Sequence, residues 1–248
     1  MVEIRSLTYR YPDSARNALD GITLTIPGGA FVALMGANGS GKSTLARCVN
    51  GLLRPLSGEV LVDGNSPADR EGSRAGGPGV GMVFQNPHAQ ITSLTVEREL
   101  AFGLQNLRVD PPEFRLRIEE HLASSGLGHR RTASPRSLSA GEQQRLALAS
   151  VLATRPAHLI LDEATSLLSP ASRADLLRAV RDDRKARGTT VLLVTQFAAE
   201  ALEADRLIVL REGRVSHDGA PSELFASAGE MASLGVRVPL RWEAGLRE

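Results

Sequence analysis

Cysteine and long hydrophobic runs are both scarce in this sequence of 248 residues. The single cysteine, Cys48, excludes an internal disulfide and any zinc site built from several cysteines, and it suits a reducing compartment. The longest apolar runs, such as residues 30–35 and 191–194, are far shorter than the roughly 18 residues that a membrane span needs. Residues 1–10 lack the apolar core of a signal peptide. We therefore expect a cytoplasmic protein.

An excess of charge of either sign is also missing. The chain has 29 basic and 28 acidic residues and a net charge of +1, so it carries no strong field that would attract nucleic acid or anionic lipid. We therefore expect no nucleic-acid partner. Lysine is also scarce, and Lys42 and Lys185 are the only two lysines in the chain.

What the sequence does contain is an alternation of strand and helix patterns. Short apolar or alternating runs predict strands, and apolar residues at helical spacing predict helices. The expected strands span residues 2–9, 22–26, 31–35, 59–62, 80–84, 158–161, 190–194 and 207–210, and the expected helices lie within 41–50, 95–152, 171–187 and 221–228. Strands that alternate with helices predict an α/β fold with a mostly parallel sheet. Residues 64–79 have almost no large apolar side chains and predict a loop.

Residues 36–43, with the sequence GANGSGKS, fit the phosphate-binding pattern G-x-x-x-x-G-K-[ST]. The pattern follows an apolar strand and precedes a helix, as the chemistry requires, because backbone N–H groups and a helix N-terminus then face the phosphates. In this interpretation Lys42 reaches the β- and γ-phosphate oxygens, and Ser43 can bind Mg²⁺. The alternative is an ordinary glycine-rich turn.

A phosphate loop needs a carboxylate on a neighbouring buried strand to complete the metal shell. Residues 158–163, with the sequence HLILDE, supply one. Asp162 is the candidate on the magnesium side, and Glu163 is placed to take a proton from a water molecule that attacks the γ-phosphate. Together with the phosphate loop, this pair predicts a nucleoside triphosphatase.

The expected base is adenine. Guanine-specific enzymes of this class use an Asn-Lys-x-Asp loop, whereas Lys185 lies between Arg184 and Ala186. Both tyrosines of the chain, Tyr9 and Tyr11, lie in the N-terminal segment, where a flat ring could stack on adenine. The alternative for these rings is core packing.

The segment between the two phosphate-binding motifs carries a family resemblance. Residues 138–145, LSAGEQQR, are similar to the LSGGQ signature of ATP-binding cassette (ABC) ATPases, and Gln85 matches the family's Q-loop glutamine. The chain resembles these ATPases along nearly its full length. The resemblance implies a P-loop NTPase fold with a RecA-like core, an N-terminal antiparallel β subdomain and an inserted α-helical subdomain. It implies one ABC domain over 1–248, with the core in 1–86 and 156–220, the helical subdomain in 87–155 and a C-terminal extension in 221–248.

The resemblance also implies a role for individual residues, with ATP and Mg²⁺ as cofactors. It gives catalytic roles to Glu163, Gln85 and Gln196, and magnesium to Ser43, Gln85 and Asp162. The signature residues Ser139, Ala140, Gly141 and Glu142 face the ATP of a partner subunit. It implies that the chain's own ATP contacts Tyr11, Gly36, Asn38, Gly39, Ser40, Gly41, Lys42, Ser43 and Thr44.

Within the family, several short segments resemble the ATPase subunits of energy-coupling-factor importers for vitamins and metal ions. These segments are residues 9–12, 84–87, 95–97 and 101–104, together with Gln90. Such ATPases work in pairs on a transmembrane subunit. The resemblance therefore implies a second ATPase subunit, identical or, more in keeping with the departures below, different, and a location on the inner face of the cell membrane.

The sequence departs from the family pattern at four positions. Gln196 stands where the family has its switch histidine, and glutamine has no titratable group. Ser169 replaces the aspartate that ends the D-loop, while Ala140 and Glu142 replace a glycine and a glutamine of the signature. A competing interpretation of Ser139 and Glu142 is a helix capping box, S-x-x-E.

These departures suggest a degenerate half of an asymmetric pair, with weak ATP hydrolysis. The alternative is an ATP-gated regulatory or dimerisation subunit with little or no hydrolysis of its own. A third possibility, a soluble ABC protein of translation or DNA repair, needs tandem cassettes or a long coiled-coil insertion, and the chain has neither.

Overall fold

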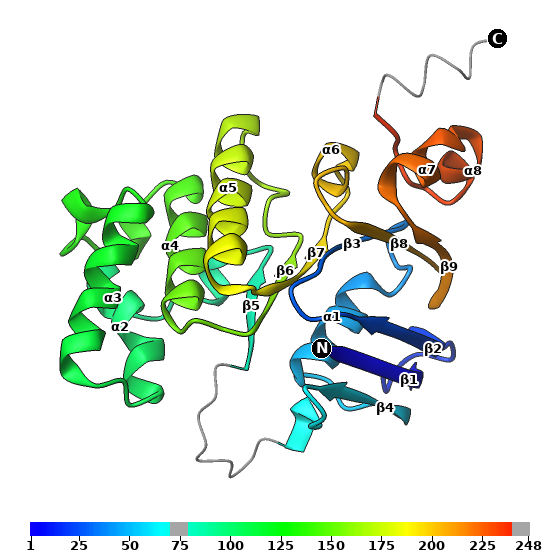
Figure 1. The fold of residues 1–248 in the computed structure, drawn as a ribbon, viewed down its shortest axis with the longest axis horizontal. Coiled ribbons are helices and arrows are strands. Elements are labelled where there is room, and N and C mark those ends of the chain that lie inside the picture. The colour runs from blue at the N-terminus through cyan, green and yellow to red at the C-terminus, as the bar shows by residue number, and fades with distance from the viewer. Residues whose placement is uncertain (70–78, 240–248) are drawn as a thin grey trace. The chain divides into compact units, whose positions relative to one another are not determined.

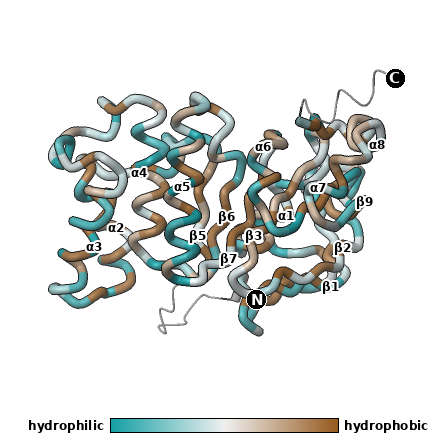
Figure 2. Tube along the Cα trace, turned by 45° about the horizontal axis from the view of Figure 1, so that its top comes forward, coloured by the Kyte–Doolittle hydropathy of each residue, from teal (hydrophilic) through white to brown (hydrophobic). Residues whose placement is uncertain are grey.

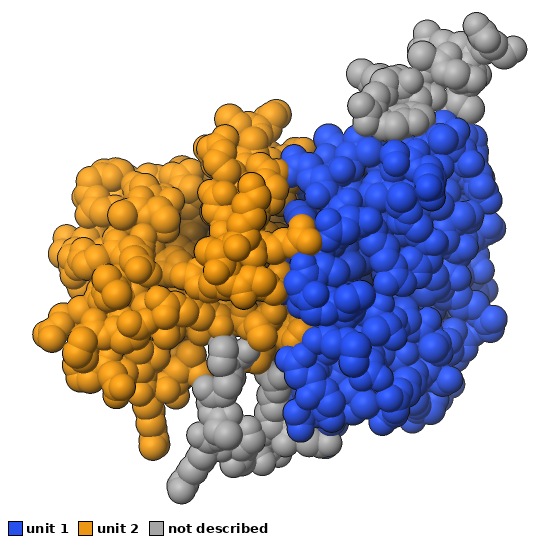
Figure 3. Space-filling view, in the orientation of Figure 1, with its two compact units in different colours: residues 1–73, 190–248 blue, residues 74–189 orange. Residues whose placement is uncertain are grey.

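The computed structural model describes residues 1–69 and 79–239. The chain divides into two compact units, one made of Met1–Ser73 and Thr190–Glu248 and the other of Arg74–Thr189 (Figure 3). Most of the loop expected over 64–79 lies outside the described residues. The expected helical subdomain, 87–155, falls within the second unit, and its boundaries stay a prediction.

The first unit contains a three-stranded antiparallel sheet in the order β2-β1-β4. Strand β1 (Val2–Tyr9) pairs with β2 (Leu19–Ile26) and β4 (Ser57–Val62), so that Val2 lies opposite Ile26 and Val62. The alternating sequence buries one face of each strand, including Ile4 and Leu7 of β1. This sheet is the N-terminal antiparallel subdomain that the resemblance implied.

The second sheet of the first unit runs in the order β7-β3-β8-β9. Strand β3 (Phe31–Met35) is buried at every residue and is parallel to both β7 (Thr190–Val194) and β8 (Arg206–Arg211). Helix α1 (Lys42–Asn50) contacts both β4 and β7, and thus lies between the two sheets (Figure 1). The short helices of this unit are α6 (Ala198–Ala201), α7 (Pro221–Ala226) and α8 (Ala228–Ser233).

The sequence did not predict strand β9 (Arg214–Gly219), which pairs antiparallel with β8. Its residues, RVSHDG, alternate between exposed and half-buried, so they carry no apolar signal. The strand forms because Glu212 and Gly213, with φ of 49° and 78°, make a tight turn after β8.

The second unit combines a parallel strand pair with helices. Strand β5 (Val80–Phe84) pairs with β6 (His158–Asp162), with Phe84 opposite Asp162. The helices are α2 (Val96–Asn106), α3 (Pro111–Ser124), α4 (Ala140–Ala153) and α5 (Pro170–Arg187), and the short 3-10 turns of the chain are η1 (Pro67–Asp69), η2 (Pro87–Ala89), η3 (Gly128–Arg130) and η4 (Pro135–Ser137).

Apolar side chains make a separate core for the helices of the second unit. Leu100, Leu104, Ile118, Leu122 and Leu146 come from α2, α3 and α4 and are buried together. Hydrophobic residues also lie along β5 and β6 in this unit, and along β3 and β7 in the first (Figure 2). Among the described residues, no helix is both long and apolar enough to span a bilayer.

Candidate nucleotide-binding site

The predicted phosphate loop, residues 36–43, lies in the first unit between the end of β3 and the start of α1. Its backbone shape requires glycine at two positions. Gly36 has φ of 141°, and a Cβ there would lie 2.2 Å from the Leu210 carbonyl oxygen. Gly41 has φ of 106°, and a Cβ there would lie 2.5 Å from the Ala18 carbonyl oxygen. The loop therefore turns sharply against its neighbours while residues 37–39 remain exposed.

Lys42 holds this loop in shape. Its side chain is buried, and Nζ donates to the carbonyl oxygens of Gly36 at 2.9 Å and Ala37 at 3.0 Å. Helix α1 begins at Lys42, and its N-cap residue, Gly41, provides no side-chain cap. The N–H groups of the first turn and the positive end of the helix dipole thus favour an anion at this position. The geometry fits a bound phosphate chain.

Tyr11 is half-exposed and is held by two neighbours rather than packed into the core. Its hydroxyl lies 3.2 Å from Oγ1 of the buried Thr44, and its ring contacts the Tyr9 ring edge-on with centroids 5.0 Å apart. The side chain is 37% exposed, so one part of the ring surface is available for stacking. This exposure argues against core packing of Tyr11, and its role as an adenine platform stays a prediction.

The carboxylates predicted to act on magnesium and water lie in the second unit. Asp162, 4% exposed, is the last residue of β6, and Glu163 follows it in the left-handed region with φ of 51°. Because β5 and β6 are parallel with Phe84 opposite Asp162, Gln85 and Glu163 both emerge at the carboxyl ends of their strands. This is the edge of a parallel sheet where ligands of α/β proteins bind.

Gln85 is exposed, and its Nε2 donates to Oγ of Ser166 at 3.1 Å. This bond uses the amide N–H and leaves the amide oxygen as the atom that can bind a cation. In the second unit Gln85 and Asp162 thus offer an amide oxygen and a carboxylate, and in the first unit Ser43 offers a hydroxyl; all three are hard oxygen donors of the kind that Mg²⁺ prefers. The described part of the chain contains no group of three or more His, Cys, Asp or Glu residues suited to a metal ion. Magnesium would therefore depend on phosphate oxygens for much of its coordination, so these donors fit it only as a complex with the nucleotide.

The signature segment forms a complete capping box at the start of α4. Ser139 is the N-cap, its Oγ accepts from the Glu142 N–H at 3.3 Å, and the Glu142 carboxylate accepts from the Ser139 N–H at 2.8 Å. The bonds from the backbone and then the side chain of Ser139 lower the pKa of Glu142. Ala140 and Gly141 are the first two residues of the helix. The competing capping-box interpretation is thus confirmed, whatever else Ser139 does.

The other two departures from the family pattern lie just outside a helix and a strand. Ser169 is the N-cap of α5, and its Oγ accepts from the Ser172 N–H at 3.3 Å and donates to the Ser172 hydroxyl at 3.1 Å. In the first unit, Gln196 is exposed two residues after β7. The turn around it is fixed because Thr195 donates to Glu200 and accepts from the Phe197 N–H.

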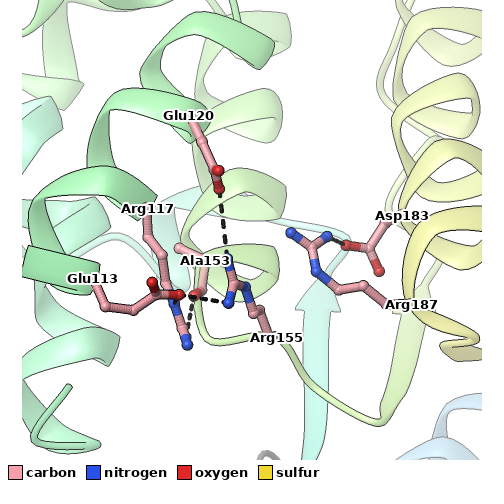
Figure 4. Close-up of polar contacts among 7 residues, drawn as sticks. All are labelled: Glu113, Arg117, Glu120, Ala153, Arg155, Asp183 and Arg187. Carbon is pink, nitrogen blue, oxygen red and sulfur yellow. Dashed lines mark hydrogen bonds and ion pairs between the residues drawn. The ribbon is translucent and has the colours of Figure 1, made fainter. Parts of the chain in front are cut away.

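A cavity of about 690 Å³ lies elsewhere in the second unit, between α3, α4 and α5. It contains none of the predicted site residues, and its lining includes the buried residues His121 and Asp183. Nearby, Arg155 bonds with Glu113 and lies within 3.8 Å of Glu120, while Arg117 donates to the Ala153 carbonyl oxygen (Figure 4). These contacts join α3 to the end of α4 and to the loop that follows it, so they stabilise the packing of the helices.

One polar contact beside Gln85 could not be identified from the sequence. Buried Gln144, on the second turn of α4, donates its Nε2 to the carbonyl oxygen of Phe84 at 3.0 Å, directly before Gln85. A glutamine within a helical pattern gives no signal of such a contact, because its partner is distant in sequence.

Comparison with known proteins gives a consistent result. Residues 19–166 match the family model described as ABC transporter. The chain is 45% identical over 232 residues to the energy-coupling factor transporter ATP-binding protein EcfA1 of Symbiobacterium thermophilum, a match that covers 94% of this chain and 81% of that protein. It is 40% identical over 236 residues to the corresponding protein EcfA of Syntrophomonas wolfei, over 95% of this chain and 86% of that protein.

Solved structures resemble the chain over most of its length. CbiO1 from Clostridium perfringens, described as part of the ABC transporter complex CbiONQ, aligns with a TM-score of 0.81 and 33% identity over 98% of this chain and 97% of that one. A dimeric ATP-binding cassette in a post-hydrolysis state, bound to ADP and Pi, aligns with a TM-score of 0.81 and 28% identity over 89% of this chain and 99% of that one. The P-loop ABC ATPase fold predicted from the sequence is thereby confirmed.

Proposed function

Because the chain belongs to the ABC transporter family of ATP-binding proteins, and is an ATPase that binds ATP, we propose that it serves an energy-coupling-factor importer for a vitamin or a metal ion. In that role ATP-driven closure of an ATPase dimer moves a membrane partner. The observation that carries the proposal is the 45% identity to an energy-coupling-factor ATPase over 94% of the chain, together with a phosphate loop of the required geometry.

The residues of the first unit bind and orient the nucleotide. Lys42 and the N–H groups at the start of α1 hold the β- and γ-phosphates, and Tyr11 stacks on the adenine. Gln196 donates a hydrogen bond from its amide to the γ-phosphate.

The residues of the second unit manage hydrolysis. Glu163 accepts the proton of the attacking water. Ser43 of the phosphate loop, with Gln85 and Asp162, would hold Mg²⁺, which when bound neutralises charge on the phosphates.

The proposed partners are a second ATPase subunit and a transmembrane subunit, with the chain on the inner face of the cell membrane. The relatives' names support these partners, since CbiO1 is described as part of a complex. The second unit also exposes large apolar side chains, Leu94 at 74% and Phe102 at 52%. The buried Glu99 fixes the loop before Leu94 by accepting from the N–H groups of Thr92 and Ser93. A fixed loop that presents an exposed leucine suits contact with a membrane subunit.

We further propose that the chain is the degenerate half of an asymmetric pair. Ser139 is already bonded to Glu142, Ser169 is bonded within its own helix, and Gln196 cannot carry a positive charge. The capping box also favours the second candidate, a regulatory subunit that binds ATP and dimerises but hydrolyses little. Single-turnover hydrolysis with and without the partner subunits separates the two, because only the first predicts stimulation by the partners.

Calorimetry with Mg-ATP on purified protein tests the ATP binding on which the proposed function depends. Wild type is expected to bind ATP in preference to GTP, and Lys42→Ala is expected to lose the binding heat because the loop loses both its internal bonds and its phosphate cation. The matched control is Lys185→Ala, which removes the exposed lysine of α5 and should bind like wild type. Absence of heat for wild type, or unchanged binding by Lys42→Ala, would overturn the proposal.

A further inference from the structure

The backbone of Phe84, at the end of β5, is held by glutamine side chains at both of its polar groups, which belong to the peptide groups before and after the residue. Its N–H donates to Oε1 of Gln90 at 3.2 Å, and its carbonyl oxygen accepts from Nε2 of Gln144 at 3.0 Å. Gln90 also donates to the Met82 carbonyl oxygen at 3.2 Å. Backbone groups at a strand end need partners of this kind, and here the partners are side chains with a fixed reach.

The two glutamines come from different elements. Gln144 is 2% exposed and lies on α4, the helix that the signature residue Ser139 caps. Gln90 is half-buried and follows the η2 turn. The end of β5 is therefore tied to the signature helix on one side and to the following turn on the other.

The residue that depends on this arrangement is Gln85, which follows Phe84 directly. Gln144 holds the peptide group that joins Phe84 to Gln85, and Gln90 holds the peptide group before it. The side chain of Gln85 is exposed and bonded only to Ser166 in the described part of the chain. The Gln85 amide can thus leave Ser166 by side-chain rotation while its anchor stays in place.

We infer that Gln144 and Gln90 are positioning residues that set the location of the Gln85 amide oxygen for Mg²⁺ and join it to the signature helix. The inference rests on the proposed function, which gives Gln85 its role toward magnesium. Residues that orient a metal ligand commonly change metal affinity by about 10- to 100-fold when removed. A purely structural role for Gln144 would change stability without changing magnesium dependence.

The test replaces Gln144 by methionine, which keeps the length of the side chain and removes the donor. ATP binding and hydrolysis of the full chain are measured against Mg²⁺ concentration, with ATP binding in the absence of Mg²⁺ as a reference. We expect Gln144→Met and Gln90→Met to raise the Mg²⁺ midpoint about 10-fold. The Mg²⁺-free affinity for ATP should stay at the wild-type value.

The matched control is Gln143→Met. Gln143 is the adjacent residue of α4, is 3% exposed, and donates Nε2 to the Pro135 carbonyl oxygen at 3.0 Å. The control thus loses an equally buried bond that does not touch Phe84, and its Mg²⁺ midpoint should stay near wild type. An equal shift in Gln143→Met and Gln144→Met, or no shift in Gln144→Met, overturns the inference. Wild type that binds no Mg-ATP would instead overturn the proposed function.

A further variant, Gln144→Glu, gives a readout that packing alone does not move. A carboxyl group donates to the Phe84 carbonyl only when protonated, so its Mg²⁺ midpoint should approach that of wild type as the pH falls, with wild type measured at each pH. A midpoint difference that is independent of pH overturns the inference. If Gln144→Met does not fold, Gln90→Met and Gln144→Glu carry the same comparison.

Discussion

The hydroxyl of Ser139 donates to the carboxylate of Glu142 at 2.9 Å. Together with the two backbone bonds of the capping box, this contact engages the Ser139 hydroxyl, as both donor and acceptor, at the start of its own helix. A cap of this type stabilises a helix by about 1 kcal/mol. In the proposed pair the cap would have a functional cost, because a hydroxyl that donates to a neighbouring carboxylate does not donate to the phosphate of a partner, and the charge of Glu142 would oppose that phosphate.

Replacing Glu142 by glutamine is therefore expected to increase hydrolysis by the assembled ATPase pair. Glutamine at this position can still cap the helix, but it carries no charge. Removing one like charge near phosphate at a solvated site is worth about 1 kcal/mol, or about fivefold in rate. Steady-state ATP hydrolysis measures the effect, and an unchanged thermal midpoint would establish that the cap persists. A rate equal to or below wild type contradicts the argument.

Gln196→His is expected to raise single-turnover hydrolysis about 10-fold or more, since a histidine can carry charge or move a proton beside the γ-phosphate. The glutamine side chain is exposed on a turn fixed by Thr195, so the exchange needs no repacking. The ratio of the variant's hydrolysis rate to the wild-type rate should rise as the pH falls through about 6.5, where the new imidazole takes up its proton. Equal rates and equal pH profiles for variant and wild type would refute it.

Contiguous sequence patterns predicted the parts of the structure that depend on local chemistry. The apolar run that ends at Gly36 fixed β3 to the residue, and β5 and β7 were predicted to the residue for the same reason. The phosphate loop could be predicted because its pattern lies within eight consecutive positions, residues 36–43. The broad helical stretch over 95–152 could not be divided in advance, and α2, α3 and α4 are separated by loops whose boundaries depend on packing.

What the sequence could not predict depends on residues far apart in the chain. The bond from Gln144 to Phe84 joins positions 60 residues apart, and only the packing of α4 against β5 brings them together. Strand β9 is similar, because its polar residues become a strand only through pairing with β8. The contact of Tyr11 with Thr44 likewise joins the loop after β1 to α1, 33 residues apart. Contiguous motifs can thus be recognised in the sequence, whereas the contacts that position them cannot.

Cys48 provides a probe of the folded first unit. The thiol is buried on α1, and burial raises its pKa from 9.0 to about 12. The reactive form is the thiolate, so we expect labelling by a thiol reagent to be at least about 100-fold slower in the native protein than in denaturant. Because Cys48 is the only cysteine, the signal is unambiguous, and Cys48→Ala gives the blank. Equally fast labelling of folded and unfolded protein contradicts the burial of this helix face.

His121 makes the stability of the second unit depend on pH. It is 6% exposed, its Nε2 has no hydrogen-bond partner among the described residues, and its pKa falls from 6.5 to about 4. Burial is the main cause. Arg187 and Arg155 lower the pKa further, whereas Glu120 and Asp183 oppose the shift.

The imidazole therefore stays neutral in the folded chain at pH values where the unfolded chain takes up a proton, so folding loses stability as the pH falls from 6.5 toward 4. At 1.36 kcal/mol per pH unit this loss reaches about 3 kcal/mol. His121→Phe should flatten the decline of the urea midpoint between about pH 6.5 and about pH 4.5. His129→Phe, which changes an exposed histidine, should keep the wild-type decline, and the same steepness in His121→Phe as in wild type would show that the buried ring is not the cause.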